Sequence, residues 1–227
     1  MWGIGYRLER HFNDLGMFSI EDIAHYDKSK LKKRFGIIGE EIWYHCHGID
    51  MSMIKDKARL RIKAKSFGIS QVLFKDYNEQ NIQTIILEMV DDVTRRLRLA
   101  KKRAKTISLS IGYSKHIGGG FSHQLSLSQP TVHETVVYKV CLELFDAYYL
   151  GYPIRKVGLF LSNLDDNNYY QYSLFEDVET LNKEYRLQSS LDTIKHRYGK
   201  NAITRAVSEE DHATAKKRNQ QMGGHHV

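Results

Sequence analysis

The sequence predicts an α+β protein built from two folded parts. Two glycine turns, each followed by apolar residues at helical spacing, predict a small all-helical module over residues 1–50. Two longer helical stripes and four period-two segments follow in the order β-α-β-β-α-β. That order predicts a four-stranded antiparallel sheet with both helices on one face, over residues 67–165. Residues 51–66 are then a basic tether, and residues 166–227 supply a loop, a C-terminal helix and a basic tail.

The helical module opens with a hydrophobe-Gly-hydrophobe-Gly turn that contains Gly3 and Gly5, and Gly36 and Gly39 punctuate a second turn before a helix. Such a turn is typical of a helix-hairpin-helix, because glycine lets the chain turn tightly and lets backbone N–H groups approach a phosphate. The alternative is a pair of ordinary turns between helices. The presence of two such glycine turns on a basic chain favours phosphate binding. Because no helix precedes the first hairpin, we expect the chain to be cut from a longer protein.

Basic residues alternate with smaller or apolar residues along the tether, at Lys55, Lys57, Arg59, Arg61, Lys63 and Lys65. Alternation at period two predicts an extended segment with one basic edge. We expect this edge, with Ser66 after it, to follow an anionic partner. A solvated linker is the alternative.

The sheet module combines amphipathic helices with strands that have one apolar side. The expected elements are a strand over 71–74, a helix over 82–97, a hairpin of strands over 106–113 and 121–128, a helix over 132–147 and a strand over 157–161. Pro130 and Thr131 are expected to end the hairpin. With the helices on one face, the other face is left with small polar side chains, chiefly Ser108, Ser110, Ser122 and Gln124. Hydroxyl groups bind phosphate without reading base sequence.

The charge balance favours an anionic partner, most often nucleic acid. Lys and Arg number 34 against 27 Asp and Glu, for a net charge of +7. No apolar run is long enough to span a bilayer and no signal peptide is evident, so we expect a cytoplasmic, nucleoid-associated protein without a membrane partner. Cys46 and Cys141 are expected to be reduced thiols.

The residues that catalysis and metal binding require are not grouped in this sequence. Two-metal nucleotidyl transfer needs carboxylates clustered on adjacent strand ends, whereas Asp91 and Asp92 lie on a predicted helix and Asp165 and Asp166 in a predicted loop. We therefore predict no catalytic residue and no metal ligand. A helix-hairpin-helix nuclease or glycosylase is disfavoured for the same reason.

A short peptide after the predicted sheet has the pattern of sequences that bind bacterial sliding clamps. Leu174 and Phe175 would fill an apolar pocket while Gln171 forms a hydrogen bond in a neighbouring subsite. The alternative is that Leu174 and Phe175 begin the following helix and pack into the core.

These segments together resemble the C-terminal half of Y-family translesion DNA polymerases, in particular the UmuC-like group of the UvrX type from Gram-positive bacteria and their phages. The resemblance rests on the two glycine turns, on residues 48–50 and 65–73, and on the peptide that contains Gln171. It implies a thumb over residues 1–50 and a little finger over residues 67–165, acting in error-prone DNA repair and the SOS response.

The resemblance also implies specific roles. Primer-template DNA would be contacted through Gly3, Gly5, Gly36, Gly39, Arg61, Lys63, Lys65, Ser66, Ser108, Ser110, Ser122 and Gln124, and the sliding clamp through Gln171, Leu174 and Phe175. The palm and its acidic metal ligands are missing from the sequence, so we expect DNA binding without nucleotide addition. No cofactor is then needed, because Mg²⁺ would serve only the palm of the parent enzyme. No oligomer is expected, and a free-standing nucleic-acid-binding adaptor is the alternative function.

Overall fold

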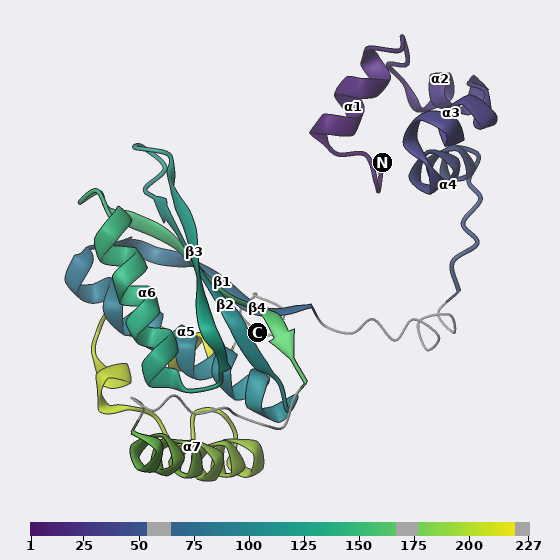
Figure 1. The fold of residues 1–227 in the computed structure, drawn as a ribbon. Helices are drawn as coiled ribbons and strands as arrows, with labels where there is room; N and C mark the ends of the chain where they lie inside the picture. The colour runs from purple at the N-terminus through teal and green to yellow at the C-terminus, as the bar shows by residue number, and fades with distance from the viewer. Residues whose placement is uncertain (54–64, 167–176, 221–227) are drawn as a thin grey trace. The chain divides into compact units, whose positions relative to one another are not determined.

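The computed structural model describes residues 1–53, 65–166 and 177–220 (Figure 1). The chain forms two compact units, Met1–Lys63 and Ala64–Val227. We call them the helical unit and the sheet unit. The α+β fold class predicted from the sequence is confirmed, with four helices in residues 1–53 and a four-stranded antiparallel sheet in the second unit.

The helical unit contains short helices whose ends follow local capping rules. They are α1 (Tyr6–Asn13), α2 (Ile20–His25), α3 (Lys28–Phe35) and α4 (Ile37–Cys46). A capping box begins α2: the Ser19 hydroxyl accepts from the Asp22 N–H at 3.0 Å, and the Ser19 N–H donates to Asp22 Oδ2 at 2.8 Å. Gly36 ends α3 in the left-handed region, with φ of +66°.

Close packing of α3 against α4 holds this small unit together. Its buried core consists of Phe12, Met17, Ile23, Leu31 and Ile42. Gly39 is buried at the contact between the helices, and a Cβ added there would lie 2.5 Å from the Leu31 carbonyl oxygen. The glycine therefore serves close helix packing, which a larger residue would prevent.

The sheet unit has the predicted order of elements. They are β1 (Ser66–Tyr77), α5 (Glu79–Leu99), β2 (Arg103–Tyr113), β3 (Gly120–Thr131), α6 (Glu134–Tyr148) and β4 (Ile154–Asp165). The strands lie in the order β1-β4-β2-β3, and every neighbouring pair is antiparallel. Strands β1 and β4 are longer than their apolar segments in the sequence, because the pairing continues from Ser66 to Ser70 in β1 and from Ser162 to Asp165 in β4.

The expectation that Pro130 and Thr131 end the hairpin is wrong, because β3 continues through both residues. The pairing with β2 shifts between the Thr106–Ser126 pair and the Ala104–Thr131 pair, so Pro130 lies in an irregular part of the ladder. Strand β3 is also at the edge of the sheet. An edge strand tolerates proline at such a position because no ladder hydrogen bond from its nitrogen is required.

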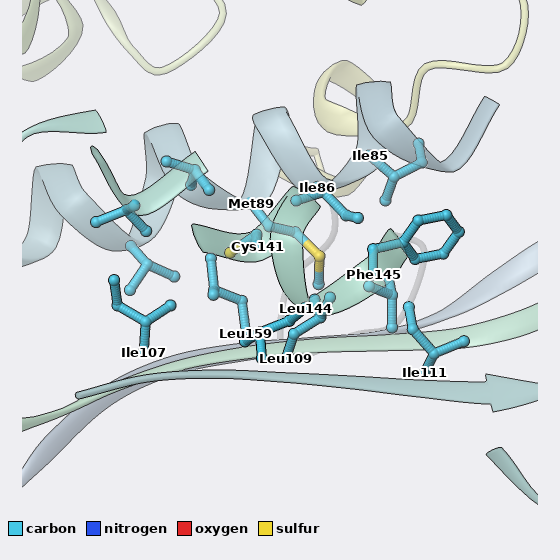
Figure 2. Packing of buried hydrophobic residues seen from close by; sticks show 14 of the residues in the cluster. Ile85, Ile86, Met89, Ile107, Leu109, Ile111, Cys141, Leu144, Phe145 and Leu159 are labelled. Atoms are coloured by element: carbon cyan, nitrogen blue, oxygen red, sulfur yellow. The ribbon is translucent and has the colours of Figure 1, made fainter. Parts of the chain in front are cut away.

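The main core lies between one face of the sheet and helices α5 and α6. Figure 2 shows strand side chains meeting those of the helices; the labelled residues are Ile107, Leu109, Ile111 and Leu159 from the strands, Ile85, Ile86 and Met89 from α5, and Cys141, Leu144 and Phe145 from α6. All ten are buried. Because side chains alternate across a strand, burying this face leaves the other set of strand residues outside the core.

Three further elements pack against α5: α7 (Val178–Tyr198), η2 (Ala206–Glu209) and α8 (Ala215–Asn219). We call them the C-terminal layer. Arg218 of α8 also donates to Gln71 of β1 at 3.1 Å. The residues of α7 that become buried are Gln188 and Asp192. Polar contacts thus dock α7, although the sequence shows apolar residues at helical spacing along it.

A buried ionic network joins this layer to α5 and α6. Asp192 accepts from Arg98 at 2.7 Å, and Arg98 also contacts Glu134 at 3.3 Å. Gln188 and Arg205 donate to the other oxygen of Glu134. The side chains of Arg98 and Glu134 are 4% and 2% exposed, so each charge depends on its partners for stabilisation.

Candidate nucleic-acid interface

The helical unit presents two helix starts that lack a side-chain cap. Gly5 and Gly36 are the N-cap residues of α1 and α4, and neither can supply an acceptor. Side chains cap α2, α3, α5 and α7, through Ser19, Asp27, Asn78 and Asp177. Carboxylates from elsewhere accept from the first N–H groups of α6 and α8, through Glu184 and Glu88. Among the α-helices in the described ranges, α1 and α4 alone start without such an acceptor.

At the start of α1, the backbone N–H groups of Gly3, Gly5, Tyr6 and Arg7 have no acceptor within the described part of the chain. Gly3 has a φ of +90°, a conformation that favours glycine. The N-terminus of a helix carries partial positive charge as well as free donors, so this turn has the chemistry of an anion site.

At the start of α4 the available donors are not those of the two glycines. The Gly36 N–H already donates to the Lys32 carbonyl at 2.9 Å, and the Gly39 N–H to the Gly36 carbonyl at 3.1 Å. The N–H groups of Ile37 and Ile38 have no acceptor among the described residues. Gly36 therefore provides the turn and Gly39 the packing, and the sequence pattern pointed to the right turn but not to its donors.

The sheet unit presents a face of small polar side chains, which we call the open face. Ser108 lies opposite Gln124 and Ser110 opposite Ser122 in the pairing of β2 with β3. All four lie on the side of the sheet away from α5 and α6, since their neighbours Ile107, Leu109 and Ile111 point into the core. Ser66 starts β1 and pairs with Ser162 of β4 on the same face.

The register extends this face beyond the residues that the sequence indicated. The additional members from β1 and β4 are Gly68, Ser70, Val72, Lys156, Gly158, Phe160 and Ser162, and those from β2 and β3 are Thr106, Gly112, Gly120 and Ser126. Period-two alternation from Ser66 to Val72 and from Lys156 to Ser162 is the signal that could have found the first set.

Hydroxyl groups on the open face bond to one another as well as facing outward. Ser108 Oγ donates to Gln124 Oε1 at 3.3 Å, and the Thr106 and Ser126 hydroxyls lie 2.8 Å apart. None of the residues named above for this face carries a carboxylate, and Lys156 is exposed on it. Beyond them, the Arg103–Asp165 pair ends the ladder between β2 and β4. Lys65, also exposed, comes directly before β1. This part of the face therefore offers donors to an anion, with no carboxylate among its own residues.

The carboxylates of α5 lie on its side away from the sheet. Asp91 pairs with Lys195 at 2.6 Å and Asp92 with Lys200 at 3.0 Å. Burial by itself would raise the pKa of Asp92, but the hydrogen bond and charge of Lys200, with Arg96 and Arg218, hold it below its ordinary value. These groups serve the attachment of the C-terminal layer.

Cys46 and Cys141 are free cysteines, and burial raises the pKa of Cys141 to about 12. In the described ranges, no group of three or more His, Cys, Asp or Glu side chains is placed to hold a metal ion. Nor does any helix there have the length and apolar character needed to cross a bilayer.

Some predicted site residues lie outside the described residues. They are Arg61 and Lys63 of the tether and Gln171, Leu174 and Phe175 of the clamp-binding peptide. The remaining predicted residues divide between the two units, with Gly3, Gly5, Gly36 and Gly39 in the helical unit and Lys65, Ser66, Ser108, Ser110, Ser122 and Gln124 in the sheet unit. They constitute two candidate surfaces.

Comparison with known proteins assigns the family. Residues 64–174 match the impB/mucB/samB family C-terminal domain. The chain is 42% identical over 228 residues to UvrX of Bacillus subtilis (strain 168), a protein named for UV-damage repair, covering 99% of this chain and 54% of UvrX. It is 32% identical over 227 residues to DNA polymerase IV 2 of that organism, covering 100% of this chain and 54% of the polymerase. The chain thus spans about half the length of these two relatives.

A shorter relative is covered more fully. The DNA repair protein homolog YobH of Bacillus subtilis (strain 168) is 43% identical to this chain over 153 residues, which are 66% of this chain and 70% of YobH. The four strands that form the sheet all fall within the matched family domain. The chain therefore belongs to the impB/mucB/samB family of Y-family DNA polymerases, and its sheet unit contains the C-terminal domain of that family.

Proposed function

We propose that these residues are the DNA-binding part of an error-prone translesion DNA polymerase that acts in DNA repair. They would hold primer-template DNA through its phosphate backbone, in the cytoplasm and as a monomer. The observation that carries this proposal is the open face, on which hydroxyl groups are gathered and Lys156 is exposed. Family membership and the net charge of +7 support it.

The helical unit would bind phosphate through main-chain donors. No described residue accepts from the N–H groups of Gly3, Gly5, Tyr6 and Arg7 at α1, or from those of Ile37 and Ile38 at α4. A phosphate at a helix start gains hydrogen bonds and a favourable dipole interaction at once. Gly3 and Gly5 can then donate their own N–H groups, whereas Gly36 acts by shaping its turn and Gly39 acts through packing.

The sheet unit would bind through side chains. Ser66, Ser108, Ser110, Ser122 and Gln124 are spread over three strands of one face, so they can meet several consecutive phosphates. Contacts of this kind fix the position of a duplex and carry no base information. We therefore propose slight sequence preference and a strong dependence on salt.

Equilibrium binding of the full chain to a labelled primer-template duplex tests this proposal. Log affinity should fall linearly with log salt, because phosphate contacts release counterions. Scrambling the duplex sequence should change the affinity by less than about threefold, in keeping with backbone contacts. A strongly sequence-specific interaction that ignores salt would contradict the proposal, as would failure to bind any duplex at low salt.

We also propose that nucleotide addition is not an activity of these 227 residues. The matched family domain is the C-terminal one, and the chain spans about half of UvrX and of DNA polymerase IV 2. Mg²⁺ would then be needed only by the palm of a complete polymerase. A primer-extension assay with Mg²⁺ and all four deoxynucleotides should show no incorporation by this chain, and any incorporation intrinsic to it would refute this part.

Docking on the bacterial sliding clamp is the third component of the proposal. Its support is the pattern of Gln171, Leu174 and Phe175 in the sequence. In a pull-down with the purified clamp, Leu174→Ala and Phe175→Ala should each reduce retention strongly. Leu187→Ala is the matched control, because Leu187 is 57% exposed on α7. Equal retention of all variants would discredit the docking peptide.

A further inference from the structure

One aromatic side chain stands on the open face among residues that are mostly glycine, serine and threonine. Phe160 lies on β4, between Ser108 of β2 and Gly68 of β1 in the register. Its side chain is on the solvent side of the sheet, and the residue is 41% exposed. The flanking residues on its own strand, Leu159 and Leu161, are both buried in the core.

Two glycines provide the seat for this ring. A Cβ added at Gly68 would lie 2.1 Å from Cδ1 of Phe160, and one added at Gly158 would lie 3.2 Å from Cε2. The ring therefore leans over the backbone of the neighbouring strand. Glycine inside a strand weakens the strand, so these two glycines cost stability. A residue with a Cβ at Gly68 would remove that cost but would displace the ring.

Polar donors surround the seated ring. Ser70 pairs with Gly158, Ser110 lies opposite Gly158 on the other side, and Ser162 follows two residues after Phe160. Lys156 precedes Gly158 on the same face and is exposed. An apolar ring among hydroxyls and a cation combines a stacking surface with phosphate ligands, as in proteins that bind single-stranded nucleic acid.

The shape of the ring decides which part of DNA it can contact. Bases in a duplex present only their edges in the grooves, whereas an unpaired base presents a whole face. We propose that Phe160 is the stacking site for one unpaired base of the template strand, beside the primer-template junction. This inference rests on the proposed DNA-binding function and adds to it a specific contact with single-stranded DNA.

The alternative role of the ring is structural, because an aromatic side chain can shield strand glycines from water. Two substitutions of Phe160 distinguish the structural role from the stacking role. Leucine would cover the same glycines without a π face, and tyrosine would retain the stacking surface.

The experiment compares two DNAs with the full chain: a blunt duplex, and the same duplex with a 5′ overhang that carries one 2-aminopurine. We expect tighter binding to the overhang DNA and quenching of the 2-aminopurine fluorescence. Phe160→Leu should lose about 5- to 150-fold in affinity for the overhang DNA, as expected for one base–aromatic stack, and should abolish the quenching. Its affinity for the blunt duplex should stay within about twofold, and Phe160→Tyr should behave like the wild type.

Gly68→Ala tests the seat with Phe160 still present. The new methyl group would displace the ring, so quenching should fall as it does in Phe160→Leu. Equal losses on both DNAs in Phe160→Leu, or unchanged quenching, would overturn the stacking site while leaving duplex binding intact. Failure of the wild type to bind either DNA would instead refute the proposed function, and this inference with it.

Discussion

The helical unit and the sheet unit offer hydrogen-bond donors of different kinds. At α1 and α4 the donors belong to the main chain, at turns shaped by glycine. On the open face they belong to side chains such as Ser110 and Ser122. The small core of the helical unit depends on Gly39, whereas the sheet unit buries a continuous core between its sheet and α5 and α6.

This difference decides in which unit a mutation can change DNA binding without changing the fold. A serine on the open face can be removed without disturbing the core behind it. In the helical unit the donor groups are part of the helix itself, so most substitutions leave them in place, and changes of glycine alter the fold together with the donors. Single substitutions can therefore weaken DNA binding without affecting folding only in the sheet unit. The one exception is a proline substitution in the helical unit, described below.

The largest expected effect concerns the ionic network of the sheet unit. Arg98→Met leaves Asp192 buried without its cation and leaves Glu134 with Arg205 as its remaining cation. We expect a loss of about 3–5 kcal/mol, the usual consequence of breaking a buried ion pair. Amide hydrogen exchange should show the loss in α5 and β2 and not in α3 or α4. The control Arg186→Met changes an exposed arginine of α7 and should stay within about 0.5 kcal/mol.

A smaller effect is expected from the packing of the helical unit. Gly39→Ala forces a methyl group against the Leu31 carbonyl and should cost about 1–3 kcal/mol through overpacking. Gly5→Ala is the control, since Gly5 has an ordinary φ of −97° and open space around it. Trp2 and Trp43 are the two tryptophans of the chain, so tryptophan fluorescence during urea unfolding reports the helical unit. Equal midpoints for both variants would contradict the packing role of Gly39.

Acid should reveal a contribution from Asp92 in the sheet unit. Its pKa is below the ordinary value in the folded state, so its stabilising effect is present above that ordinary value and is lost as the pH falls below about 4. Asp92→Asn should make stability less dependent on pH in this range. The fluorescence transition of the helical unit should not change, and an unaltered acid dependence of the sheet unit would contradict this assignment.

The smallest effects compare one donor from each unit in DNA binding. Tyr6→Pro removes a main-chain N–H at the first position of α1, where proline suits the helix and the extended Gly5 before it; Tyr6→Ala is its control. Ser110→Ala removes one hydroxyl. Each lost donor should cost about 0.5–1.5 kcal/mol of binding free energy, or about 2- to 13-fold in affinity. Fluorescence anisotropy with the same duplex measures both, and equal affinities of Tyr6→Pro and Tyr6→Ala would exclude that donor.

Sequence periodicity was sufficient to predict the architecture of the sheet unit. The stripe from Ile82 to Leu97 and the alternation from Thr106 to Tyr113 predicted α5 and β2, because each period matches one buried face. The helix over α7 was also expected. Its attachment was not, since Gln188 and Asp192 are buried only through partners such as Arg98 and Glu134, which lie far away in the sequence.

The candidate surfaces were predicted in part. Ser108, Ser110, Ser122 and Gln124 follow from alternation within one hairpin. Alternation along β4 could have placed Phe160 on this face, but not its contact with Gly68, because that contact depends on the pairing of β4 with β1 across the sheet. At the second glycine turn, hydrogen bonds to Lys32 and Gly36 within the unit determine which N–H groups remain available, and no local pattern encodes them.

The ionic attachment of the C-terminal layer limits the positions at which this chain can be joined to a segment of another protein. The matched family domain ends at residue 174, before α7 begins. A gene rearrangement that joined a foreign segment at that boundary would remove Asp192 and Arg205 and strand Arg98 and Glu134 in the interior. The structural unit here is therefore larger than the matched family domain, and successful chimaeras should carry the parental chain through Asn219.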